Sequence, residues 1–193
     1  GSTDIANGEP GILRNHSVYR GLINSLVLSV ICAFFAGTIG ILAGYSIVRK
    51  KGTFLSNAVS HLTFFPYLIP SMAFGVIYLS MFSVPRGPIP ALYGTFAILA
   101  LIGTVKYLPF ASKSGINCML QLGNEIEESA IIMGIPWWKR MVRIIIPIQK
   151  TSILSGYLLP FISCMRELSL FILLVTPSTA VLTTMLFQYN EKG

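Results

Sequence analysis

The chain has 193 residues, of which 53% are hydrophobic and 11% are charged, and it carries a formal net charge of +7. Its mean hydropathy of +0.72 is too high for a soluble domain of this length, so we predict an all-α integral membrane protein. The basic residues stand between hydrophobic runs and do not form one patch with aromatic residues, which argues against a nucleic-acid partner.

The first predicted membrane segment covers residues 20–48, after a polar lead-in. No charged residue occurs from Gly21 to Val48, a length of about 42 Å as a helix against a hydrocarbon core of about 30 Å. Small residues recur every three or four positions along it and predict close packing against a neighbouring helix. They are Gly21, Ser25, Ser29, Ala33, Gly37, Gly40 and Gly44.

The second predicted membrane segment, residues 54–84, contains Pro66 and Pro70 in the middle of an uncharged run. Two prolines four residues apart remove backbone donors, so this segment is not expected to be a straight helix. A broken backbone at membrane depth is tolerated where it is buried in protein or lines a cavity, which makes both prolines candidates for a translocation path. The alternative is that they separate a helix over 54–65 from a membrane span over 71–82.

The third and fourth predicted membrane segments cover residues 90–112 and 150–176. In the fourth, helical spacing gathers the polar and small residues on one face, namely Ser152, Ser155, Gly156, Ser163, Arg166 and Glu167. Ionisable side chains inside a span are costly in lipid, so Ser163, Arg166 and Glu167 are candidates for the same path. A structural ion pair that bridges two helices is an equally valid interpretation of Arg166 and Glu167.

No metal site is predicted. The three cysteines, Cys32, Cys118 and Cys164, are far apart and lack metal-binding or disulfide spacing, so we expect them to be buried as small hydrophobic residues. His61 has no Cys, Asp or Glu nearby that would complete a ligand set.

A polar interruption over residues 121–147 separates the last two membrane segments. Ile126, Ala130 and Met133 share one face of a short helix, and Gly134 suits the left-handed position at its end. Pro136 fits the first turn of a second helix, which begins with an aromatic and basic cluster. Chemistry alone leaves open an amphipathic helix that lies at the membrane surface without a partner.

The same interruption resembles the "EAA loop" of type I ABC importer permeases, which follows the pattern E-A-A-x3-G-x9-I-x-L-P. The matching positions are Glu128, Ser129, Ala130, Gly134, Ile144 and Pro147. Both long spacings agree with the pattern, and the departures are Ser129 for the first alanine and Ile146 for leucine. The chain is therefore similar to the binding-protein-dependent inner-membrane components of these importers.

The resemblance implies that residues 121–147 form a cytoplasmic helix-turn-helix that docks on a separate ABC ATPase subunit. The chain would then be no enzyme and would need no cofactor, because ATP binds to the partner. Further implied partners are a periplasmic or lipoprotein substrate-binding protein, a second permease half or an identical copy, and the lipid bilayer. The implied location is the bacterial cytoplasmic (inner) membrane, which the chain would cross several times.

The resemblance also implies a MetI-like core, which has five spans. Four are predicted here, so the last span is expected to be missing and residues 1–193 to be a single permease domain from a longer chain. Arg166-Glu167-Leu168-Ser169 and the following Leu- and Thr-containing stretch are similar to the ferric iron branch. Polyamine, sulfate, phosphonate and molybdate remain open as alternative substrates. The alternative function is that of a secondary transporter or channel segment without an ATPase partner.

Topology follows from the basic residues once residues 121–147 are taken as cytoplasmic. Nine basic residues are then predicted inside and four outside, in agreement with the positive-inside rule. The inner group is Arg49, Lys50, Lys51, Lys106, Lys113, Lys139, Arg140, Arg143 and Lys150.

Overall fold

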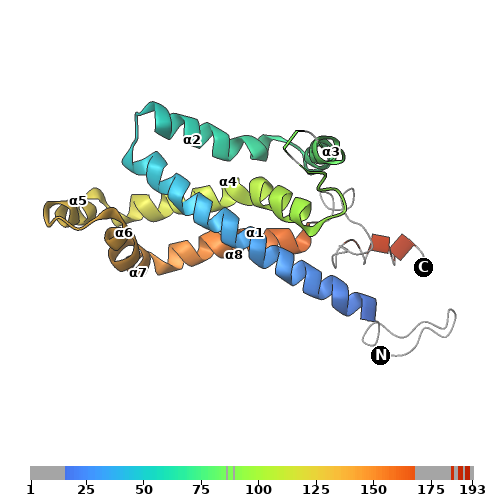
Figure 1. Cartoon of the computed structure of the whole chain (residues 1–193). Coiled ribbons are helices and arrows are strands. Elements are labelled where there is room, and N and C mark those ends of the chain that lie inside the picture. The colour runs from blue at the N-terminus through green and yellow to red at the C-terminus, as the bar shows by residue number, and fades with distance from the viewer. Residues whose placement is uncertain are drawn as a thin grey trace. The chain divides into compact units, whose positions relative to one another are not determined.

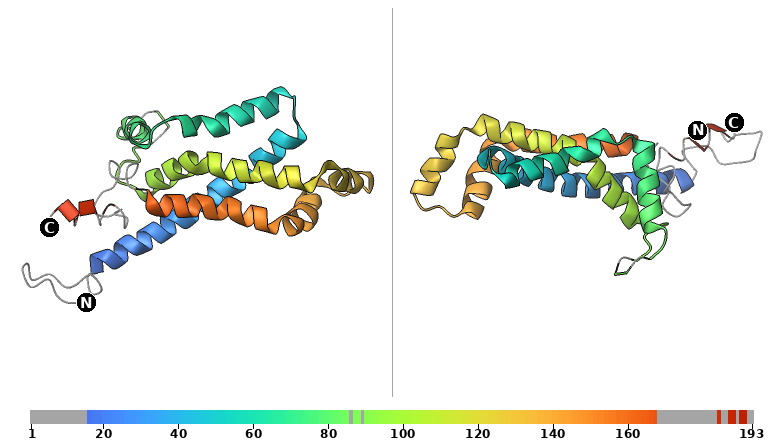
Figure 2. Two further views of the ribbon diagram at one scale, coloured as in Figure 1. Left: turned by 180° about the vertical axis from the view of Figure 1, so that it is seen from behind. Right: turned by 90° about the horizontal axis from the view of Figure 1, so that it is seen from above.

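The computed structural model describes residues 16–85, 87–88 and 90–167, together with 184, 187–188 and 190–191. This part of the chain contains helices and turns but no strand, as predicted for an all-α protein. Figure 1 shows the helices, and Figure 2 gives two further views. Their bounds are α1 His16–Arg49, α2 Phe54–Phe64, η2 Phe65–Leu68, α3 Ser71–Phe82, α4 Phe96–Leu122, α5 Asn124–Ile132, α6 Trp137–Arg140, η3 Met141–Ile145, α7 Ile146–Ile148 and α8 Lys150–Arg166.

The chain divides into two compact units. One unit comprises residues 1–31, 69–103 and 162–193, and the other comprises residues 32–68 and 104–161. The second unit holds the C-terminal half of α1, all of α2 and η2, most of α4, and the helices α5 to α7. It therefore contains the whole polar interruption together with the helices that precede and follow it.

Two helices of the described part are long and apolar enough to cross a membrane, Tyr19–Arg49 and Phe96–Leu122. Two further pairs of helices, each interrupted by a break of a few residues, raise the number of candidate spans to as many as four. The helix expected over 20–48 is α1. The break expected in the second segment is present, because η2 and residues 69–70 separate α2 from α3.

The third helix differs from the expected bounds of 90–112. It begins at Phe96 because a turn precedes it, in which Gly94 has φ +79° and the N–H groups of Leu92 and Tyr93 donate to the Phe82 carbonyl. It continues to Leu122, since one face of its last turns is buried through Cys118, Met119 and Leu122. Lys113, Asn117 and Gln121, which follow the expected end of the third segment, are therefore part of this helix.

The fourth helix, α8, begins at Lys150 as expected and ends at Arg166. The remainder of the segment expected over 150–176 lies outside the described residues, apart from Glu167.

The small-residue stripe of α1 is a packing face, as predicted. Within the second unit, a Cβ built on Gly40 would lie 2.5 Å from the Ala111 carbonyl carbon, and one on Gly44 would lie 2.3 Å from the Gly115 carbonyl carbon. Both neighbours are backbone atoms of α4, which no rotamer change can move. Gly37 faces the Tyr157 ring, whose hydroxyl shares a 3.0 Å hydrogen bond with Thr38 Oγ1. The lack of side chains at these positions thus brings α1 and α4 into backbone contact.

Gly44→Val should separate α1 from α4 and destabilise the protein, because overpacking a site with a rigid neighbour costs about 1 to 3 kcal/mol or more. The measurement is thermal unfolding of the purified protein in detergent. Gly156→Ala is the control, since its Cβ would meet only the Ser114 side chain, at 3.3 Å. Equal unfolding midpoints for the two variants would contradict the packing argument.

Candidate coupling site

The turn after α5 is set by Gly134, which has φ +72°. The Gly134 N–H donates to the Ile131 carbonyl at 2.9 Å, and the Ile135 N–H donates to the Ala130 carbonyl at 3.0 Å. This pair of bonds is the Schellman arrangement, which satisfies the last carbonyls of a helix and requires a left-handed residue. The left-handed conformation expected at Gly134 is confirmed.

The second half of the interruption starts one residue later than expected. Pro136 precedes α6 as its N-cap, and its carbonyl accepts from the N–H groups of Lys139 and Arg140 at 3.0 and 3.1 Å. The chain then continues through a π-helical turn, η3, into α7. Pro147 accounts for the wide turn, because a proline cannot donate to the carbonyl four residues before it and its ring clashes with that carbonyl. The segment ends at Ile148, where its axis makes an angle of 86° with α8.

Glu127 holds this segment to α1. Its side chain is only 5% exposed, although it belongs to the first turn of a surface helix. Tyr45 donates its hydroxyl to Oε1 at 2.5 Å, and Arg49 donates Nε to Oε2 at 2.6 Å. Arg140 Nε lies 3.6 Å from Oε1, so α1, α5 and α6 meet at one buried carboxylate.

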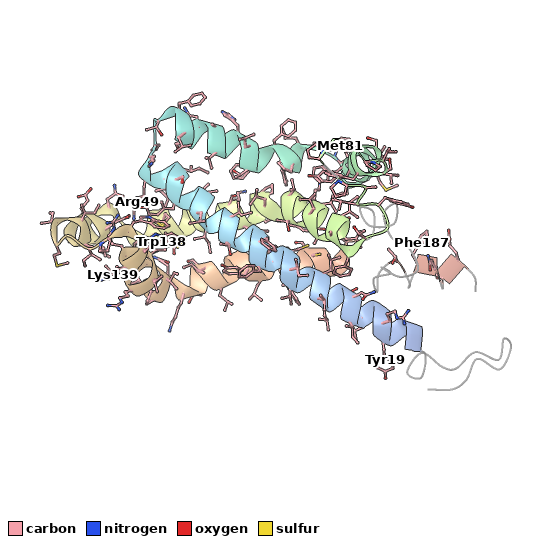
Figure 3. All side chains as sticks on the ribbon, viewed as in Figure 1. Tyr19, Arg49, Met81, Trp138, Lys139 and Phe187 are labelled. Atoms are coloured by element: carbon pink, nitrogen blue, oxygen red, sulfur yellow. The ribbon has the colours of Figure 1, made fainter. Side chains whose placement is uncertain are left out.

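The two arginines also bind the backbone at both ends of α5. Arg49 donates to the Asn124 side chain and, at 3.1 Å, to the Gly123 carbonyl. Arg140 donates Nη1 to the Ile135 carbonyl at 2.7 Å. Bonds of a charged donor to such acceptors are stronger than bonds between neutral groups. The ion pairs therefore fix the position of α5 and also the turn that follows it. Figure 3 labels Arg49 at the end of α1, and Trp138 and Lys139 in α6.

An apolar layer lies beneath the ion pairs. It is formed by buried residues of α4 and η3, with side chains of α1, α6 and α8 packed against them. Tyr45 contributes to both layers, because its ring meets the Trp137 ring edge-on at 5.9 Å while its hydroxyl binds Glu127. The buried members are Cys118, Met119, Leu122, Met141 and Ile145, and the partly buried ones are Tyr45, Val48, Trp137 and Ile153.

The pattern residues divide into an inward and an outward group. Ala130 is buried and Ile144 is partly buried, whereas Glu128, Ser129, Gly134 and Pro147 are exposed. Of the apolar stripe expected on α5, only Ala130 packs inward, because Ile126 and Met133 are 41% and 69% exposed. Ile131, Ile132 and Trp138 are exposed as well, so this end of the second unit presents apolar side chains outward.

Glu127 was not among the candidate residues. The sequence pattern drew attention to its neighbour Glu128, which is exposed and forms no ion pair within the described residues. A signal was available, since Glu127 stands three residues before Ala130 and therefore shares its helical face. The basic run Arg49-Lys50-Lys51 offered a partner for a carboxylate on that face.

A pocket of about 290 Å³ opens beside this ion-pair cluster. Its lining combines both charge signs with an apolar residue and comprises Tyr45, Arg49, Lys50, Asn124, Glu127, Glu128 and Ile131. In the described part of the chain, no three His, Cys, Asp or Glu residues lie close enough together to hold a metal ion. Cys32, Cys118 and Cys164 are buried, as expected, and none of them is in a disulfide bond.

The candidate path residues are divided between the two units, with Pro66 in the second unit and Pro70, Ser163, Arg166 and Glu167 in the first. Pro66 is buried in η2 and Pro70 is exposed at the start of α3. Arg166 is exposed at the last residue of α8, with Ser163 and Glu167 partly buried near it. Two serines of the expected polar face bind within the chain, Ser152 to the Gln121 side chain at 3.2 Å and Ser155 to the Thr151 carbonyl at 3.1 Å.

Residues 36–192 match the family model described as binding-protein-dependent transport system inner membrane component. The chain belongs to this family. A solved structure, of inward-facing conformations of the MetNI methionine ABC transporter, has the same fold with a TM-score of 0.70 and 19% identity over 91% of this chain and 81% of that one. The predicted MetI-like fold is confirmed.

The curated proteins that resemble this chain are named for transport of different substrates. A putative ferric transport system permease protein, FbpB 1, of Haemophilus influenzae is 28% identical over 84% of this chain and 25% of its own length. A phosphate transport system permease protein, PstA, of Mycobacterium leprae is 30% identical over 85% of this chain and 53% of its own length. The sulfate transport system permease protein CysT of Escherichia coli is 23% identical over 81% of this chain and 58% of its own length. The chain thus spans about a quarter to about a half of the length of these relatives.

Glu127→Ala should destabilise the second unit by about 3 to 5 kcal/mol, because it leaves Arg49 and Arg140 partly buried without their carboxylate. The measurement is thermal unfolding in detergent, with proteolysis at residues 123–149 as a local probe. Glu125→Ala is the matched control, since Glu125 is an exposed acid of the same helix turn. If both variants unfold like the unmodified protein, Glu127 does not hold the segment in place.

Proposed function

We propose that this chain is a permease subunit of an ATP-driven importer, and that residues 121–147 couple it to a separate ATPase subunit. The observation that carries the proposal is the rigid attachment of α5 and its turn to α1 through Glu127, next to pattern residues that face outward. A segment that is fixed on one side and exposed on the other can transmit a displacement of its partner to the helices behind it.

The exposed apolar side chains supply the docking surface of this proposal. Ile131, Ile132, Met133 and Trp138 are 53%, 87%, 69% and 72% exposed and lie at the turn between α5 and α6. A short helix with such a face suits a groove on a folded partner, where burial of apolar area drives binding. ATP binds to and is hydrolysed by that partner, so the chain itself needs no cofactor and catalyses no reaction.

The remaining partners follow from the family. We propose that a periplasmic or lipoprotein substrate-binding protein delivers the solute, and that a second permease half or an identical copy completes the path. The apolar helices then cross the bacterial inner membrane several times.

Ferric iron is the substrate that we propose, because two of the similar curated proteins are named as ferric transport permeases. Phosphate, sulfate and 2-aminoethylphosphonate are the alternatives that other relatives carry in their names. The similarity to the iron branch rests on the stretch that begins at Arg166. Apart from Arg166 and Glu167, most of this stretch lies outside the described residues. Uptake of radiolabelled iron, phosphate and sulfate by the reconstituted transporter would separate these substrates, and uptake of an oxyanion in place of iron would overturn the assignment.

We also propose that Pro66, Pro70, Ser163, Arg166 and Glu167 contribute to the translocation path. The proline break and the serine, arginine and glutamate near the end of α8 are polar or irregular features within an otherwise apolar chain, which favours contact with solute or water.

Replacement of Gly134 tests the coupling role. Gly134→Val forces a β-branched residue into a left-handed conformation, which costs about 1 to 2 kcal/mol and reorients the turn. Uptake and stimulation of the ATPase by the substrate-binding protein should collapse while membrane insertion stays normal. Gly52→Val is the matched control, because Gly52 also has a left-handed φ, +86°, and open space around it but lies outside the segment. Unchanged uptake in the Gly134 variant would refute the coupling role.

Replacement of the charged residues at the end of α8 tests the path role. If Arg166 and Glu167 line an aqueous route, Arg166→Ala should lower uptake without lowering the amount of assembled complex, because water solvates the remaining acid. The double variant Arg166→Leu with Glu167→Leu should then assemble and fail to transport. Assembly together with normal uptake in the double variant would show that the two residues have no part in the path.

A further inference from the structure

Lys106 places an ammonium group well inside an apolar helix. It is the eleventh of the 27 residues of α4 and precedes Leu122 by sixteen residues, a distance of about 24 Å along the helix. Its side chain is partly buried, and its neighbour Tyr107 is buried. The positive-inside count places Lys106 in the cytoplasmic group; in the structure it lies in the first half of α4, away from the end that leads into residues 121–147.

The packing of α1 against α4 gives the depth of Lys106. Gly40 meets Ala111 and Gly44 meets Gly115, so the two helices run parallel in the second unit. Lys106 stands nine residues before Gly115, which places it about 14 Å further along the helix axis than the Gly44 contact, on the side away from Arg49. Arg49 in turn follows Gly44 by five residues, about 8 Å. Nine and five residues together correspond to about 21 Å along the helix axes between the backbone of Lys106 and the basic end of α1, which places Lys106 within the candidate span Phe96–Leu122.

The structure shows where the ammonium binds. Lys106 Nζ donates to the Pro66 carbonyl oxygen at 3.3 Å. In a continuous α-helix that carbonyl accepts from the N–H four residues later, which is the position of Pro70, and proline has no N–H. Lys106 therefore supplies a donor that the sequence has removed from the backbone.

A second contact holds the same two elements together. The Tyr67 ring, one residue after Pro66, meets the Phe110 ring edge-on at 6.1 Å. Phe110 follows Lys106 by four residues and so lies on the same face of α4. The 3-10 turn η2 thus makes both a polar and an aromatic contact with α4.

Resting on the proposed function, we propose that Lys106 is a positioning residue that joins the proline break to the coupling segment. α4 is continuous from Lys106 to Leu122, and Gly123 alone separates it from α5. A displacement of α5 by a docked ATPase is therefore passed along one helix to the ammonium. The ammonium passes it to the Pro66 carbonyl, whose α-helical donor is absent because position 70 is a proline.

Disulfide trapping in the complete transporter tests the position of the break. Tyr67→Cys and Phe110→Cys are introduced in a background without Cys32, Cys118 and Cys164, and the fraction of cross-linked protein is measured with and without ATP and vanadate. Lys106→Met should lower the cross-linked fraction about tenfold, because the charged hydrogen bond is lost. Lys113→Met is the matched control, an exposed lysine on the same helix, and should leave the fraction unchanged.

A double-variant cycle with Pro70→Ala tests the mechanism. The measurement is the fraction of the complex that stays assembled after heating. An alanine at position 70 restores the backbone N–H, so Lys106→Met should lower this fraction less than twofold in the Pro70→Ala protein. In the protein that keeps Pro70, the same substitution should lower it about tenfold. If Lys106→Met does not assemble, recovery of assembly by Pro70→Ala supports the proposal, and no recovery overturns it. Equal effects in both backgrounds also overturn it, because a general role in stability does not depend on the residue at position 70.

Two further outcomes separate this proposal from the proposed function. If Lys106→Met leaves the cross-linked fraction unchanged but abolishes uptake, the lysine contacts the solute and the positioning role is wrong. If the unmodified chain binds no ATPase, the proposed function fails, while the dependence of the cross-link on Lys106 and Pro70 still reports the contact itself.

Discussion

The backbone contact between α1 and α4 determines where the other parts of the second unit can lie. Gly40 and Gly44 on one helix and Ala111 and Gly115 on the other bring the chains together without intervening side chains. In lipid such contact provides dispersion energy that the hydrophobic effect does not supply between helices. The parallel register that results places Arg49, at the end of α1, beside Gly123, which follows α4, and Asn124, the first residue of α5.

From that register follows the electrostatic arrangement at the start of the coupling segment. Arg49 can reach Glu127 because only Gly123 lies between the end of α4 and the start of α5, so that the acid in the first turn of α5 faces α1. Arg140 returns from α6 to the same carboxylate. One buried acid between two arginines leaves a net positive charge, which an exposed acid such as Glu128 beside the pocket partly offsets.

Local chemistry made several features predictable. The φ of Gly134, the break between Pro66 and Pro70 and the small-residue face of α1 each depend on a residue type with one dominant conformational effect. The bounds of α4 were not predictable, because Lys113, Asn117 and Gln121 look like a polar linker until their opposite face is seen to be buried through Cys118 and Met119. The binding roles of Glu127 and Lys106 depend on partners about 80 and 40 residues away in the chain, which no local pattern specifies.

The wide helical turn at Met141–Ile145 has a consequence for chain length. From Pro136 to Ile148 the segment passes through α6, η3 and α7 without a loop that could absorb an added or deleted residue. One inserted residue would rotate all later side chains by about 100°, which would carry Met141 or Ile145 out of the apolar layer. Substitutions that keep size and polarity, such as Ile146 for leucine, leave that phase intact. Insertions and deletions between Gly134 and Pro147 are therefore far less tolerable than substitutions.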